Sequence, residues 1–210
     1  MKKFFLMSLL IICFNSNLKS QQKESPLIKS FKEYINHKNI TPFNIDWIQI
    51  GPVINSARVE SIQIDEKNPG TMYVAFGSGN LWKTVNNGIS WKPIFNNVPS
   101  IGIGDIALAP SNSDILYVGT GESLKKARNF TMPGTGIYKS DDGGNTWNHK
   151  GLNDSWHIGE ISINPINPDI VFVSVLGHFW TKNKNRGIYR TLDGGSTWEN
   201  VLHIDYKTGS

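Results

Sequence analysis

The sequence has little cysteine, little charge and no long apolar run, and each shortage excludes a class of protein. Its single cysteine, Cys13, lies in the apolar stretch near the N-terminus, so neither disulfides nor thiol chemistry can serve the rest of the chain. Histidines do not stand at the spacing of zinc ligands, and we therefore expect no metal and no other cofactor. Charged residues make up 18% and aromatic residues 11% of the chain, which is typical of a globular β-rich protein.

Residues 1–20 are predicted to be a secretory signal peptide. Two lysines precede an apolar run from 4 to 14, which is too short for a permanent membrane span, and a cut after Ser20 fits the small polar residues there. The alternatives are an uncleaved anchor and a lipid on Cys13, although Ile12 stands where lipidation needs a small residue. We expect a secreted or periplasmic protein with no stable membrane insertion after cleavage.

The positive charge of the chain is concentrated in this leader. Its removal deletes three lysines and no acid, which leaves 18 basic and 17 acidic residues and lowers the net charge from +4 to +1. A surface so close to neutral gives no electrostatic case for nucleic acid or an anionic membrane as partner.

Three similar nonapeptides dominate the rest of the sequence. They are KTVNNGISW at 83–91, KSDDGGNTW at 139–147 and RTLDGGSTW at 190–198, and we call them the boxes. Each follows an apolar run anchored on Tyr73, Tyr117 or Phe172, and equivalent positions are 44 to 56 residues apart. A catalytic constellation is rarely tripled, whereas repeats of this length are typical of propeller blades.

Each repeat contains four predicted strands. The first alternates polar and apolar residues, at 59–64, 104–108 and 159–163, as expected of a strand with one buried face. The second is the anchored apolar run, the third is LWKT, IYKS or IYRT, and the fourth begins at the box tryptophan. The sequence therefore predicts an all-β propeller with three four-stranded antiparallel blades. The predicted segments are a polar lead-in at 21–45 with a short helix at 26–38, an extra outer strand at 46–52, and blades at about 53–98, 99–152 and 153–205 of a partial propeller spanning 46–210.

The boxes are predicted to be tight turns between the third and fourth strands. Asp142 and Asp193 can accept hydrogen bonds from the amides of their own turn, and the glycine pairs adopt positive φ at little cost. The box tryptophans offer a large apolar body to bury between blades. Asn86 replaces the aspartate in the first copy and can make the same turn. The residues given this structural role are Ser140, Asp142, Gly144, Thr146, Trp147, Thr191, Asp193, Gly195, Thr197 and Trp198.

These residues carry a family resemblance. SDDGGNTW and TLDGGSTW resemble the Asp-box (BNR) motif, and TVNNGISW resembles a degenerate copy. The frame from 46 to 207 is similar to secreted bacterial propellers classed with the sortilin N-terminal domain and with xyloglucanases. The resemblance implies blade architecture and no single activity, because the motif occurs in sialidases, xyloglucanase-type glycoside hydrolases, sortilin-like receptors and non-enzymatic proteins.

A binding site is expected on the rim opposite the boxes. The loops between second and third strands lie there, and two of them are long, at 121–136 and 176–187. Alignment of the repeats places Ser61, Asp105 and Glu160 at one equivalent position. We hypothesise that a set of polar residues gathers at one mouth of the propeller, where ordinary solvated lining is the alternative. The set is Arg58, Asp105, Glu122, His157, Glu160 and His178.

Two functions fit this prediction. The first is an exported, non-catalytic binding or scaffold module for a protein, peptide or glycan, to which Trp156, Phe179 and Trp180 could contribute rings that stack on sugars or pack under loops. The alternative is a glycoside hydrolase that uses two carboxylates such as Asp105 and Glu160. A sialidase is the weakest version, because the chain lacks a clear arginine triad, and no catalytic residue is transferred from the resemblance.

The number of blades is too small to close a ring. Propellers typically close with four to eight blades, and three leave open strand edges and uncovered apolar faces. We therefore expect the N-terminal part of a longer protein or a truncated reading frame. If the 210 residues were the whole product, we would expect weak stability or self-association through the open edges.

Overall fold

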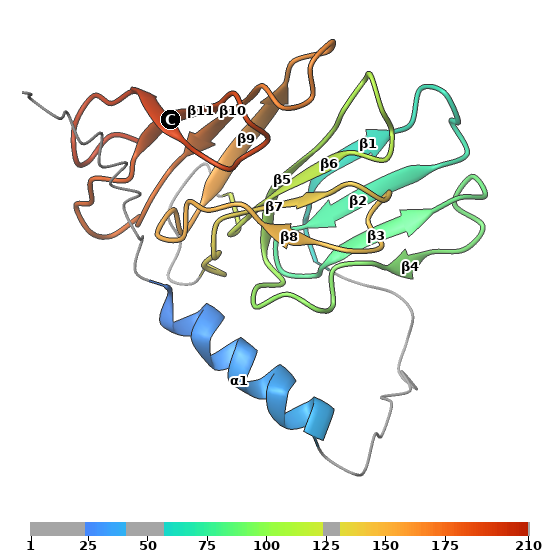
Figure 1. The fold of residues 1–210 in the computed structure, drawn as a ribbon, viewed down its shortest axis with the longest axis horizontal. Coiled ribbons are helices and arrows are strands. Elements are labelled where there is room, and N and C mark those ends of the chain that lie inside the picture. Colours follow the sequence, from blue (N-terminus) through green and yellow to red (C-terminus); the bar gives the residue numbers. More distant parts are fainter. Residues whose placement is uncertain (1–23, 41–56, 124–130, 210) are drawn as a thin grey trace, which may run out of the picture.

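The computed structural model describes residues 24–40, 57–123 and 131–209, and it confirms the all-β architecture. Three four-stranded antiparallel sheets stand side by side in chain order (Figure 1). Blade 1 contains β1 (Val59–Ile64), β2 (Met72–Phe76), β3 (Leu81–Thr84) and β4 (Lys92–Pro93). Blade 2 contains β5 (Ile103–Leu108), β6 (Leu116–Thr120), β7 (Ile137–Ser140) and β8 (Asn148–His149). Blade 3 contains β9 (Ile158–Ile163), β10 (Val171–Val175), β11 (Gly187–Thr191) and β12 (Glu199–Leu202).

The first strands of the blades lie next to one another, as in a propeller. β1 contacts β5, and β5 contacts β9. The register confirms that Ser61, Asp105 and Glu160 are equivalent, because they pair with Ala75, Gly119 and Ser174 in the second strands. One residue before each of them, the pairing register shifts, so that Glu60, Gly104 and Gly159 form a bulge at the same place in every blade.

The core consists of two apolar layers between the blades. Between blades 1 and 2, Tyr73, Leu81 and Phe95 pack against Ile106 and Val118. Between blades 2 and 3, the second layer contains Tyr117, Ile137, Ile158, Ile161 and Val173. All five residues of β6 are buried, because blade 2 is covered on both faces. Burial alternates along β2, as expected of a strand covered on one face.

The box acids are bonded within their own turns. Asp142 accepts hydrogen bonds from the Thr146 amide at 2.9 Å and from the Thr146 hydroxyl at 2.6 Å. Asp193 makes the same two bonds with Thr197, at 2.9 and 2.7 Å. The bonds from Thr146 hold the pKa of Asp142 at about 2. Partial burial pushes the pKa of Asp193 upward, but the bonds from Thr197 outweigh it and give a pKa of about 2.

The first box forms the same turn without a charge. Asn86 accepts from the Ser90 amide at 3.0 Å, and its own amide group donates to the Ser90 hydroxyl at 2.9 Å, so one bond simply reverses direction. Asn87 and Gly88 have φ values of 57° and 81°, and the two glycines of each other box occupy the same left-handed region.

Each box tryptophan in blades 2 and 3 bonds to the preceding blade. The indole N–H of Trp147 donates to the Ile94 carbonyl at 2.8 Å, and that of Trp198 donates to the Lys150 carbonyl at 2.6 Å. Ile94 and Lys150 are equivalent, since each directly follows the fourth strand of its blade. The box therefore turns the chain and also joins two blades.

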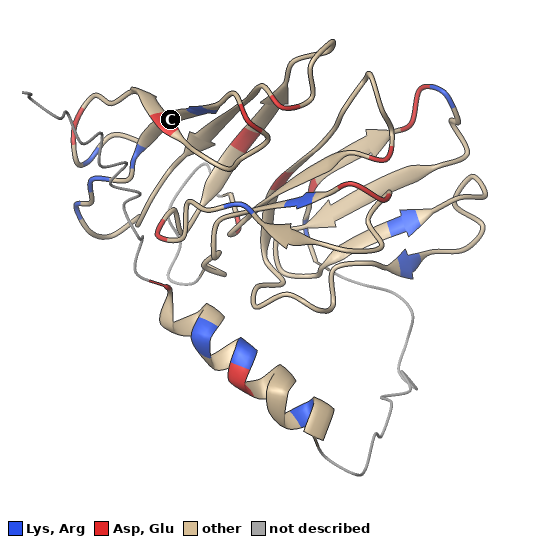
Figure 2. Ribbon diagram, viewed as in Figure 1, with Lys and Arg blue, Asp and Glu red and all other residues tan. Residues whose placement is uncertain are grey.

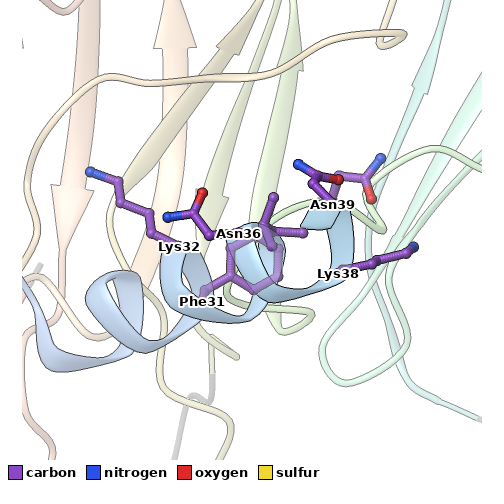
Figure 3. Close-up of a pocket in the computed structure, with 7 residues that line it drawn as sticks. Phe31, Lys32, Asn36, Lys38 and Asn39 are labelled. Atoms are coloured by element: carbon purple, nitrogen blue, oxygen red, sulfur yellow. The ribbon is translucent and has the colours of Figure 1, made fainter. Parts of the chain in front are cut away.

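Before the blades, the lead-in contains the helix α1 (Pro26–Ile40), two residues longer than expected. Its least exposed side chains, Ile28, Phe31 and Ile35, recur with helical spacing on one face. An open groove of about 680 Å³ lies between α1 and Asn97 (Figure 3). Lysines, amides, Phe31 and Ile35 line it, so its lining supplies no carboxylate.

Some predictions lie outside the described residues, namely the signal peptide at 1–20, the extra strand at 46–52 and the middle of the loop after β6. Among the residues that the structure describes, no helix is both long and apolar enough to span a bilayer.

Candidate functional site

The antiparallel topology divides the connections between two rims. The boxes and the turns between first and second strands lie on one rim. The β2–β3, β6–β7 and β10–β11 connections lie on the other, together with the segments that lead from one blade to the next. We call this second rim the loop rim. Figure 2 shows acidic and basic residues interspersed along the blades.

The residue before each first strand lies on the loop rim. The carbonyls of Arg58, Gly102 and His157 accept backbone hydrogen bonds of 3.0, 2.8 and 2.9 Å at equivalent positions of the three blades. One backbone geometry thus presents an arginine, a glycine and a histidine. The chemistry of the rim consequently differs from blade to blade.

Arg58 joins blades 1 and 2. Its guanidinium donates to Glu60 at 2.6 Å and to Glu122 at 2.5 Å, and both glutamate side chains are only 11% exposed. Burial raises the pKa of Glu60, although the bonds from Arg58 oppose the effect. Gly77 completes the cluster, because a Cβ there would lie 2.8 Å from a Glu60 oxygen. Both carboxylates are therefore occupied by the arginine.

Asp105 joins blades 2 and 3. One carboxylate oxygen accepts from the Ile161 amide at 2.8 Å. Burial raises the pKa of Asp105, and the negative charge of Glu160 adds to the rise. At the equivalent position of blade 1, Ser61 donates to the Ile106 carbonyl at 3.4 Å, so this position bonds to the next first strand in both blades. Glu160, by contrast, is exposed.

His157 is fully buried. Its Nδ1 lies 2.9 Å from the Gly177 carbonyl, which can only accept, so Nδ1 carries the proton and Nε2 accepts from the Thr131 hydroxyl at 3.0 Å. Burial lowers the pKa of His157, and the ring stacks on Phe179 with centroids 4.1 Å apart. The residue is therefore a neutral packing element of the rim.

His178 belongs to a second pair of stacked rings, which it forms with Trp156. Its ring is 3.9 Å from that of Trp156 at an angle of 28°, and its Nε2 lies 3.0 Å from an Asp154 oxygen. Trp156 has a φ of 55°, which is uncommon for a bulky residue. Trp156 is 36% exposed and Trp180 is 56% exposed, so both indoles face solvent.

The six predicted residues thus form three pairs. Arg58 contacts Glu122, Asp105 lies within electrostatic range of Glu160, and His157 and His178 belong to neighbouring stacks. The charge of Glu122 also acts on His157, which links two of the pairs. No group of three potential metal ligands exists among the described residues.

Sequence reasoning did not include three residues of the rim. Glu60 was omitted because the bulge that turns it toward Arg58 arises from the pairing register and leaves no mark in a period-two pattern. Asp154 and Asn185 belong to no motif in the sequence, yet their side chains bond to each other at 2.6 Å. In the sequence, only their nearness to Trp156 and to the loop that contains Phe179 and Trp180 could have indicated a role in binding.

No family model matches the chain. Among curated proteins, the xyloglucanase Xgh74A of Acetivibrio thermocellus is 28% identical over 173 residues, which covers 68% of this chain and 20% of the xyloglucanase. A probable oligoxyloglucan-reducing end-specific xyloglucanase of Neosartorya fischeri is 27% identical over 154 residues, covering 70% of this chain and 17% of that protein. The chain thus spans about a fifth of the length of its curated relatives.

Solved structures share the fold. An ancestral GH74 enzyme has a TM-score of 0.53 at 20% identity, over 70% of this chain and 19% of that one. YCF48 from Cyanidioschyzon merolae has a TM-score of 0.50 at 16% identity, over 73% of this chain and 40% of that one. YCF48 bound to D1 peptide also has a TM-score of 0.50, at 13% identity, over 71% of this chain and 41% of that one. The blades are therefore those of a propeller, and the curated relatives of the chain are xyloglucanases.

Proposed function

We propose that this chain is part of a propeller glycoside hydrolase of the xyloglucanase type, and that its loop rim helps to hold a β-glucan chain. The observation that carries the proposal is the 28% identity to Xgh74A over 173 residues, together with the shared blade architecture. This reverses the order of the two functions weighed from the sequence, since the glycoside hydrolase is now better supported than a purely non-catalytic module.

The state of the rim acids defines what this chain can contribute. A glycosidase needs two carboxyl groups on either side of the bond that it cleaves. Glu122 is bonded to Arg58, and Asp105 is bonded to the Ile161 amide. Of the predicted acids, Glu160 has the exposed carboxylate. We assign substrate binding to this chain and name Glu160 as its candidate catalytic carboxylate.

The proposal is tested with soluble xyloglucan and the full chain. We expect retardation of this chain in gels that contain xyloglucan. In a protein that also supplies the second carboxyl group, we expect release of reducing ends that falls in Glu160→Gln while binding persists. The matched control is Glu199→Gln, an exposed acid of β12 on the outer part of blade 3. Absence of binding to both xyloglucan and unsubstituted β-1,4-glucan would contradict the proposal.

A non-catalytic ligand-binding propeller is the second candidate. The observation in its favour is that Glu60, Glu122, Asp105 and Asp154 all bond to groups of the protein itself. It predicts binding of a glycan or a peptide without release of reducing ends. The same two measurements separate the candidates.

Export and the identity of the boxes belong to the proposal as well. The basic and apolar start of the sequence supports cleavage after Ser20, and N-terminal analysis of secreted protein should find Gln21 first. The bonding of Asp142 and Asp193 within their turns supports the assignment of the boxes as Asp-boxes. An intact N-terminus on the exported protein would refute the cleavage.

A further inference from the structure

Two exposed tryptophans lie on neighbouring loops of blade 3. Trp156 precedes β9, and Trp180 lies in the β10–β11 connection, so both belong to the loop rim. Their exposed fractions are 36% and 56%. Large aromatic side chains left in solvent on a rim of loops mark an interaction surface when the protein holds them in fixed positions.

Trp156 is held by its backbone conformation and by its contact with His178. Its backbone adopts a φ of 55°, which is unfavourable for a bulky residue and persists only where the surroundings enforce it. One ring face stacks on His178, and His178 is held by Asp154 at 3.0 Å and by the Thr181 hydroxyl at 3.3 Å. Arg186 donates to the His178 carbonyl and anchors the same loop. The indole is therefore positioned before any ligand arrives.

Trp180 stands on a second stack of rings. Its indole meets Phe179 edge to face, with centroids 6.0 Å apart and planes at 90°. Phe179 in turn stacks on the buried ring of His157. The buried ring of His157 thus supports Phe179, and Phe179 supports the exposed ring of Trp180.

Polar groups surround the two indoles. Asp154 is 57% exposed at its side chain and accepts from the Asn185 amide group at 2.6 Å. Lys182 and Lys184 are exposed in the same loop. A pyranose ring has this same division, with apolar C–H faces and hydroxyl groups around its edge. Apolar ring faces bordered by carboxylate and amide groups therefore fit a sugar better than a uniformly apolar ligand.

We propose that Trp156 and Trp180 form an aromatic platform that stacks on pyranose rings of a β-glucan chain, with Asp154 and Asn185 hydrogen bonding to hydroxyl groups at the ring edges. This inference rests on the proposed function for the class of ligand. It adds the residues that bind and places them on blade 3. The platform is a binding site and takes no part in bond cleavage.

The test measures binding of a xyloglucan oligosaccharide to the full chain by calorimetry. Trp180→Ala should weaken binding about tenfold, since the variant loses a stacked ring, whereas Trp180→Phe should retain most of the affinity. Tyr34→Ala is the matched control, because Tyr34 is an aromatic residue of α1 that is 53% exposed. Its affinity should equal that of the wild type, and all variants should unfold at the wild-type temperature.

Three outcomes separate this inference from the proposed function. Wild-type binding that survives unchanged in both Trp180→Ala and Trp156→Ala overturns the platform and leaves the proposed function standing. Wild-type protein that binds no glucan overturns both. A peptide that binds in place of the glucan and depends on Trp180 overturns the sugar assignment. A change in tryptophan fluorescence on adding glucan, present in wild type and reduced in Trp180→Phe, supports the platform independently of the affinity.

Discussion

The two junctions between blades close the loop rim by different means. At the junction of blades 1 and 2, Arg58 bridges Glu60 and Glu122. At the junction of blades 2 and 3, backbones meet directly: a Cβ on Gly104 would lie 1.8 Å from the Ile158 carbonyl oxygen. Side chains at the first junction can adjust, whereas the second has no room to do so. The same repeat thus produces one adaptable junction and one rigid junction.

The rigid junction supports the aromatic residues. A Cβ on Gly121 would lie 1.9 Å from the carbonyl oxygen of Trp156, and the Gly134 amide donates to that same oxygen at 2.6 Å. Trp156 and its neighbour His157 are thereby held against blade 2. A ligand that stacks on fixed rings loses less entropy on binding than one that must order them.

The largest expected effect comes from adding a methyl group at the rigid junction. Gly104→Ala should lower the free energy of unfolding by about 3 kcal/mol or more, because its Cβ would overlap a backbone oxygen that cannot rotate away. Chemical denaturation measures the loss. Gly70→Ala is the control, since its Cβ would have neighbours no closer than 3.6 Å, and it should be nearly neutral. Equal stability of the two variants would show that the junction is not rigid.

Removal of the arginine should have a smaller effect at the adaptable junction. Arg58→Gln should cost about 1–2 kcal/mol at pH 7, since two largely buried carboxylates lose their cation. Burial raises the pKa of Glu60, so as the pH falls this carboxyl is protonated at a higher pH than an ordinary glutamate. Its ion pair with Arg58 is then lost in the wild type as well, and the cost of Arg58→Gln should shrink.

Arg190→Gln provides the matched control for that variant. Arg190 is 36% exposed at its side chain against 39% for Arg58, and it pairs with Glu199, which is 64% exposed. Its loss should cost less than about 0.5 kcal/mol, as for an ordinary surface pair. A cost for Arg58→Gln that is equally small, or constant from pH 7 to pH 4, would argue against the cluster.

On the opposite rim, each junction is crossed by a hydrogen bond from a tyrosine hydroxyl. Tyr117 donates to the Pro168 carbonyl at 3.1 Å across the second junction, and Tyr73 donates to the Gly143 carbonyl at 3.4 Å across the first. Tyr117→Phe should cost about 1 kcal/mol, and Tyr73→Phe should cost less because its bond is long. Thermal unfolding of the two variants measures the difference. The reverse order would place the tighter contact at the first junction.

The smallest expected effect concerns the charge of the boxes. The pKa of Asp142 and of Asp193 is about 2, below the ordinary value of 3.8, so both stabilise the fold above pH 4 and lose this contribution as the pH falls toward 2. The double variant Asp142→Asn/Asp193→Asn should remove that acid dependence. It should cost no more than about 1 kcal/mol at pH 7, because Asn86 already forms the same turn and both acids lie near solvent. An unchanged acid transition would contradict the assigned bonds.

The blades could be predicted because their signals are local. The boxes mark each turn between third and fourth strands, and the alternation at 59–64 gives the bounds of β1. The other two first strands begin one residue earlier than predicted, at Ile103 and Ile158, because these residues already pair before the bulge. The equivalence of Asp105 and Glu160 also followed from the repeat alone.

The chemistry of the rim could be predicted only in part, since it depends on contacts between distant segments. Nothing near His157 in the sequence shows that Thr131 and Phe179 enclose its ring. Asp105 has the residue type of a catalytic acid, and only the packing of blade 3 shows that the Ile161 amide binds it. Whether the six predicted residues act together on a ligand stays a prediction.

Hydrogen exchange of the full chain, with and without a xyloglucan oligosaccharide, tests whether a β-glucan binds on the loop rim of blade 3, as we propose. Binding there should slow the exchange of amides in 152–157 and 176–186 when the glycan is present, with no change in the box turns at 141–147 and 192–198. Slower exchange in the boxes, or no change in any peptide at a saturating concentration of glycan, would contradict it.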